Sequence, residues 1–151
     1  MAMEDKLCRD SPGIVMDVLG LPAPQGSKRH VGGGRMVESS RKVGPWREAI
    51  VSQALRDGVA GRLLDGPLSF SAVFRMPRPN SHFGARGLKP SAPAHPTGTP
   101  DVDKLARSTL DGLSQAGVWV DDARVVILHV SKRFVLPDEA TGALLHIGVV
   151  S

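Results

Sequence analysis

The chain has 151 residues, a formal net charge of +4 and a single cysteine, Cys8. Its length suits one domain with a buried core, and the lone cysteine excludes a disulfide framework or a cysteine zinc site. No apolar run approaches membrane-spanning length, and the N-terminal sequence lacks the apolar core of a signal peptide. We therefore expect a cytoplasmic protein without a membrane partner, with a flexible leader at residues 1–12 and one domain at residues 13–151.

The N-terminal half predicts a strand, a helix and a second strand. Residues 14–21 have the apolar character of a strand that ends at Pro22. Residues 22–44 are rich in glycine, serine and basic side chains, which predicts a loop or a hairpin. A helix is expected over residues 45–56, and a strand over residues 68–76, where apolar residues alternate with small or polar ones.

Two features of this half have structural rather than chemical interpretations. Trp46, Ile50 and Leu55 can line the inner side of the helix, and a tryptophan beside Ile50 favours core packing over stacking on a base. Three glycines, Gly32–Gly34, are not followed by the Gly-Lys-Ser/Thr of a phosphate-binding loop. We therefore expect no nucleotide cofactor.

Residues 77–100 form a predicted loop, with repeated proline and glycine, that leads directly to two acidic residues. A loop of this length in a compact domain is usually functional or disordered. His82 and His95 lie in it, but a lone loop histidine is more often neither a base nor a ligand. After a further helix, we expect strands over residues 123–136 and 143–150.

Acidic residues stand at both ends of that further helix. Its predicted buried side consists of Leu105, Thr109, Leu110, Leu113 and Ala116. Asp103 is expected to be the N-cap residue, two positions after Asp101, and Gly117 the glycine that ends the helix. Asp121 and Asp122 then fall at a turn between two extended segments.

The opposite side of this helix is polar. Asp103, Arg107 and Asp111 follow one another at intervals of four residues and so share one face. We expect Asp111 to form a surface ion pair with Arg107, which lies one turn before it.

Metal binding accounts for this use of carboxylates. Mg²⁺ prefers hard oxygen ligands, and two carboxylates from Asp101 and Asp103 would be completed by Asp121 or Asp122. The alternative is that Asp103 is only a cap and the later pair only a turn. That alternative explains these residues singly but leaves Asp101 without a role.

Basic residues concentrate outside the acidic segment. No acidic residue lies between Gly66 and Pro100, and Glu38 is the only acid among several basic residues between Pro24 and Arg47. A basic surface around an acidic site suits a polyanionic substrate, although any one such residue is more often a solvated surface charge. Candidates for contacts with a phosphate backbone are Lys28, Arg29, Arg35, Arg86 and Lys89.

The segment PDVDKLARSTLDGLSQAGVWVDDARVV, residues 100–126, resembles the signature of the RusA family of Holliday-junction resolvases. These are small endodeoxyribonucleases of phages, prophages and bacteria. The stretch Pro22–Arg29 and the Pro45-Trp46 helix start are also similar to that family. The acidic segment is the specific part of a likeness that spans most of the chain.

The resemblance implies a homodimer that cuts two strands of a four-way junction symmetrically with Mg²⁺ or Mn²⁺. It implies that Asp101, Asp103 and Asp122 are the essential, metal-binding carboxylates. The family has an important lysine one turn into the helix, and Arg107 stands at the matching position. An arginine stabilises negative charge on a phosphate but is a poor proton donor, so a proton-transfer step there would have to be done differently.

Two other functions compete with junction resolution in recombination and repair. One is a nuclease acting on flaps, forks or other branched DNA, and the other is a non-catalytic module that binds branched DNA. The presence of all three carboxylates, Asp101, Asp103 and Asp122, argues against a non-catalytic module. For the fold we expect an α/β (α+β-like) domain, with a small mixed sheet flanked by two main helices.

Overall fold

The computed structural model describes residues 13–26, 28–30, 36–38 and 41–151, so the predicted leader at residues 1–12 lies outside the described residues. The elements are β1 (Ile14–Leu19), β2 (Lys28–His30), β3 (Met36–Glu38), α2 (Val43–Arg56), β4 (Leu68–Met76), η1 (Asn80–His82), β5 (Phe83–Gly84), β6 (Gly87–Leu88), α3 (Val102–Gln115), η2 (Asp122–Arg124), β7 (Val125–Phe134) and β8 (Gly142–Val149).

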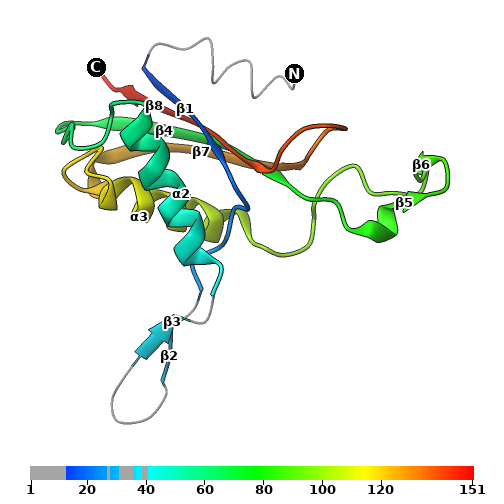
Figure 1. Cartoon of the computed structure of the whole chain (residues 1–151). Helices are drawn as coiled ribbons and strands as arrows, with labels where there is room; N and C mark the ends of the chain where they lie inside the picture. Colours follow the sequence, from blue (N-terminus) through cyan, green and yellow to red (C-terminus); the bar gives the residue numbers. More distant parts are fainter. Residues whose placement is uncertain (1–12, 27, 31–35, 39–40) are drawn as a thin grey trace.

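A four-stranded sheet in the order β1-β8-β4-β7 forms the centre of the domain (Figure 1). β4 pairs with β8 and β8 with β1 in antiparallel fashion, whereas β4 and β7 are parallel. A parallel pair needs a crossover connection, and the segment between β4 and β7 contains α3. The prediction of a mixed sheet with two main helices is confirmed, and the domain belongs to the α+β class.

The core lies between the sheet and the two helices. Alternate residues of β4, including Phe70 and Phe74, face the same cluster as Trp46 and Ile50 of α2 and Leu105 of α3. Trp46 is 1% exposed, which confirms its assignment to the core. The prediction for Leu55 was wrong: its side chain is 67% exposed. Ala54 is the buried residue in this turn of α2.

The two long loops contain short hairpins. In residues 22–44, β2 and β3 pair in antiparallel fashion, which agrees with the hairpin alternative. In residues 77–100, η1 is followed by the antiparallel pair β5 and β6, which projects from the sheet in Figure 1. None of the helices that the structure describes is long and apolar enough to cross a membrane.

The helices α2 and α3 approach closely at a glycine. A Cβ atom at Gly112 would lie 3.0 Å from Ile50 Cδ1 of α2. Interiors are packed too densely to absorb added atoms without moving their neighbours. The missing side chain at Gly112 therefore sets how deeply α3 packs against α2.

We expect Gly112→Leu to lower the free energy of unfolding by about 1–3 kcal/mol, because the added side chain overpacks the contact with Ile50. Chemical denaturation measures the change. Gly44→Leu is the control, because Gly44 is also helical but no atom lies within 4 Å of a Cβ placed there. Equal stability of the two variants would contradict this account of the helix contact.

Candidate active site

Two buried hydroxyl groups fix the rotation of α3. Ser108 Oγ donates a hydrogen bond to the Ala23 carbonyl at 2.6 Å, and Trp46 Nε1 donates to Thr109 Oγ1 at 3.1 Å. Both hydroxyl-bearing residues are fully buried. Breaking either bond would leave a buried polar group unsatisfied, which is costly. The side of α3 that carries Asp103 and Arg107 is consequently held toward solvent, and both residues are exposed.

The start of α3 differs from the prediction. Asp101, rather than Asp103, is the N-cap residue, with extended backbone angles of φ −68° and ψ 138°. Its carboxylate makes no capping hydrogen bond and instead pairs with Lys104 Nζ at 3.6 Å. Asp103 lies in the first turn, where a negative charge interacts favourably with the helix dipole. Gly117, with φ +70°, follows the C-cap residue Ala116, as predicted.

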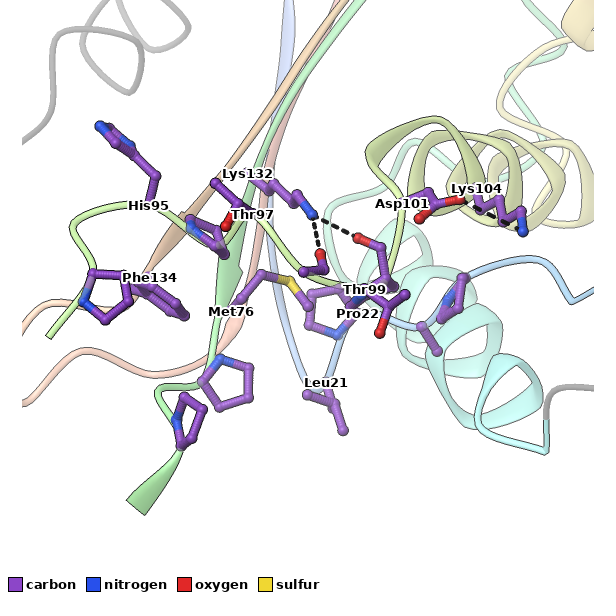
Figure 2. A pocket seen from close by; sticks show the side chains of 18 of the residues that line it. Leu21, Pro22, Met76, His95, Thr97, Thr99, Asp101, Lys104, Lys132 and Phe134 are labelled. Carbon is purple, nitrogen blue, oxygen red and sulfur yellow. Dashed lines mark hydrogen bonds and ion pairs between the residues drawn. The ribbon is translucent and has the colours of Figure 1, made fainter. Parts of the chain in front are cut away.

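Lys132 of β7 holds the segment that leads into Asp101. Its Nζ donates hydrogen bonds to the carbonyl oxygens of Gly98 at 2.6 Å and Pro100 at 2.8 Å (Figure 2). The end of the long loop is thereby attached to the sheet immediately before the Asp-x-Asp pair. This role of Lys132 could not be predicted from the sequence, because β7 and the loop are distant in the chain.

The later aspartate pair divides into two roles. Asp121 is the N-cap residue of η2, and its Oδ1 accepts a hydrogen bond from the Ala123 amide at 2.7 Å. Partial burial, together with the carboxylates of Asp121 and Asp111, raises the pKa of Asp122 above the usual value for aspartate. The positive charge of Arg107 opposes this shift. Asp122 therefore lies within electrostatic reach of the polar face of α3.

The predicted ion pair between Arg107 and Asp111 was wrong. Asp111 pairs instead with Arg47 of α2, at 3.3 Å between Oδ2 and Nη2. Arg47 also donates a hydrogen bond to the side-chain oxygen of Gln25. The backbone amide of Gln25 in turn donates to the Lys104 carbonyl of α3 at 3.0 Å. The Asp111 carboxylate is thus paired with Arg47 of the neighbouring helix. Arg107 remains on the exposed face of α3, beside Asp122.

Residues 20–139 match the family profile described as endodeoxyribonuclease RusA. That span covers most of the 151 residues and includes all the acidic and basic groups discussed above. The chain belongs to the RusA family. No curated protein matches the chain. Membership confirms the resemblance and implies an endonuclease whose substrate is branched DNA, the Holliday junction.

The carboxylates of this RusA protein suit a divalent metal without forming a closed cage. Among the residues that the structure describes, no three His, Cys, Asp or Glu side chains converge closely enough to hold a metal ion. Mg²⁺ commonly takes only one or two carboxylates and keeps its waters. Asp103 and Asp122 both offer exposed oxygen donors. The donor set therefore fits Mg²⁺ or Mn²⁺.

The candidate DNA-contacting residues fall in two loops. Arg86 and Lys89 are exposed at and beside the projecting β5–β6 hairpin. Lys28 and Arg29 belong to β2, and their side chains, like the whole of Arg35, lie outside what the structure describes.

Not every basic residue of the sequence contributes to a basic surface. The Arg75 guanidinium is buried and pairs with Asp17 at 2.7 Å. The Arg78 guanidinium lies over the ring of Phe134, 4.3 Å from its centroid, and donates to the Pro93 carbonyl. Both residues have structural roles that composition alone could not distinguish from phosphate binding.

We expect Lys132→Met to release the segment around Gly98 and Pro100, because the methionine keeps the length of the side chain but cannot donate hydrogen bonds. Hydrogen exchange of the backbone amides at residues 98–102 should become faster. Lys89→Met serves as the control, because Lys89 is exposed and lies elsewhere in the same loop. Unchanged exchange in the Lys132 variant would show that other contacts hold the segment.

Proposed function

We propose that this RusA family member is a divalent-metal-dependent endonuclease that resolves four-way junctions by paired, symmetric strand cuts in DNA recombination and repair. The observation that carries the proposal is the exposed polar face of α3. Asp103 and Arg107 lie on it and Asp122 lies beside it, while the rest of the helix is anchored in the core. A structural role does not require charged groups to be held in this way.

In the proposed site, Asp101, Asp103 and Asp122 supply the carboxylates for Mg²⁺ or Mn²⁺. Because the three do not converge on one point in the described structure, a bound ion would take one or two of them and keep several waters. When bound, such an ion activates the attacking water and stabilises the charge that develops on the phosphate. Asp103 and Arg107 are separated by one helical turn, about 6 Å along the axis, so carboxylate and guanidinium can face the same phosphodiester. Arg107 stays protonated and neutralises phosphate charge without donating a proton. Arg86 and Lys89, with Lys28, Arg29 and Arg35, contact backbone phosphates on the arms of the junction.

Asp103→Asn should abolish cleavage of a synthetic four-way junction while leaving junction binding within about twofold of the parent, because an amide is a poor ligand for Mg²⁺. Cleavage is measured on denaturing gels with Mg²⁺, and binding by fluorescence anisotropy with EDTA. Asp57→Asn is a matched control, since Asp57 is exposed at the end of α2, away from the site. Comparable cleavage rates for the Asp103 variant and the parent would rule out the assigned role.

Paired cuts require two sites, and β7 offers a surface for a second copy of the chain. β7 is an edge strand, paired with β4 on one side only within the described part of the chain. Val126, Ile127 and Leu128 are consecutive, and at least half of each side chain is exposed. An exposed apolar edge strand readily pairs with another strand. We propose that two copies of β7 meet across a twofold axis, which relates the two active sites symmetrically.

Ile127→Lys should convert a dimer into a monomer at micromolar concentration, because the two lysines would meet near the twofold axis. Sedimentation velocity measures the mass in solution. Val149→Lys is the control, because Val149 is 79% exposed but belongs to β8. A monomeric parent, or an Ile127 variant that remains dimeric, would count against this interface.

A further inference from the structure

A pocket lies beside Asp101, which is one of its lining residues. Its volume is about 650 Å³, and its walls come from residues 21–24, the end of β4 and the loop before α3 (Figure 2). Pockets that bind small ligands have volumes of about 300–1,000 Å³. The part of the long loop that follows the β5–β6 hairpin forms one wall, so the pocket exists because this loop folds back onto the sheet.

The lining of the pocket is mainly apolar. Leu21, Pro22, Met76 and Phe134 contribute to it, with further prolines from the loop. Two neighbours hold the Phe134 ring in place: the Arg78 guanidinium lies over it, 4.3 Å from the centroid, and the ring of His82, another lining residue, meets it edge-on with centroids 5.4 Å apart. A rigid apolar pocket of this kind favours a flat, weakly hydrated group over a charged one.

The mouth of the pocket carries positive charge. Lys42 and Lys104 are exposed residues of its lining, whereas Lys132 is engaged by the carbonyls of Gly98 and Pro100. The single carboxylate of the lining, Asp101, forms an ion pair with Lys104, so these two charges offset each other and Lys42 supplies the remaining exposed positive charge. Apolar walls under a cationic mouth match a nucleotide, whose base is flat and whose phosphates are anionic.

We infer that this pocket receives one unpaired nucleobase from the branch point of the DNA, with an adjacent phosphate at Lys42. The inference rests on the proposed nuclease function and adds a means of recognising its substrate. A base within a duplex must unstack to enter, which costs free energy, whereas a base at a branch point unstacks at lower cost. The pocket thus favours branched DNA over linear duplex and places the branch next to Asp101.

The test uses a four-way junction with 2-aminopurine at the branch point, because the fluorescence of this base rises when it unstacks. Binding of the parent in EDTA should raise the fluorescence. Thr97→Trp places an indole in the pocket from an exposed residue of its lining, so the rise should disappear. Affinity for the junction should fall about tenfold, the effect of losing one stacked base, with affinity for linear duplex unchanged.

Ser91→Trp is the matched control, because Ser91 is exposed in the same loop but does not line the pocket. It should behave as the parent does. Leu21→Trp blocks the pocket from another part of its lining and should likewise abolish the fluorescence rise and weaken junction binding. It replaces Thr97→Trp as the test if circular dichroism shows that Thr97→Trp is misfolded. Junction binding by the parent without a rise in fluorescence would overturn the inference, as would full affinity in both blocked variants.

Cleavage separates this inference from the proposed function. A parent that cuts junctions with Mg²⁺ but does not unstack 2-aminopurine contradicts the pocket and leaves the nuclease intact. A parent that unstacks the base and never cuts supports the pocket and contradicts the nuclease.

Discussion

The anchoring of α3 in the core is the constraint on which the rest of the structure depends. Ser108 and Thr109 bury their hydroxyl groups in hydrogen bonds to the Ala23 carbonyl and to Trp46. Gly112 lets the helix pack against Ile50 of α2. Because the helix cannot rotate without breaking these contacts, Asp103 and Arg107 must face solvent. The same anchoring holds Asp101 next to the pocket and Asp122 next to the polar face of the helix.

Regular elements could be predicted from the sequence because their periodicity reflects burial. The alternation along residues 68–76 and the apolar side of residues 105–116 both correspond to buried faces of the actual elements. The start of α3 was placed two residues late. Asp101 and Asp103 both have a side chain typical of an N-cap, so preference for residue type could not decide between them.

Tertiary contacts explain the remaining errors. Local spacing favoured an ion pair between Asp111 and Arg107, but Arg47 from the adjacent helix took the carboxylate. The basic stretch between Gly66 and Pro100 includes Arg75, whose buried guanidinium pairs with Asp17 and so adds nothing to a basic surface. The pocket beside Asp101 was not predicted, because it depends on Lys132 and Phe134 meeting a loop more than thirty residues away. For the site itself, Asp101, Asp103, Asp122 and Arg107 were identified as candidates from the sequence. Their chemical roles are part of the proposed function.

The central claim is that the exposed carboxylates beside α3 direct metal-dependent cleavage to branched DNA. The most direct measurement compares a labelled synthetic four-way junction with a linear duplex of the same sequence, each incubated with Mg²⁺ and with EDTA. We predict symmetric nicks in the junction alone, and only with Mg²⁺. Binding of the junction without cleavage under any divalent metal would contradict the account and leave a DNA-binding module whose acidic face needs another explanation.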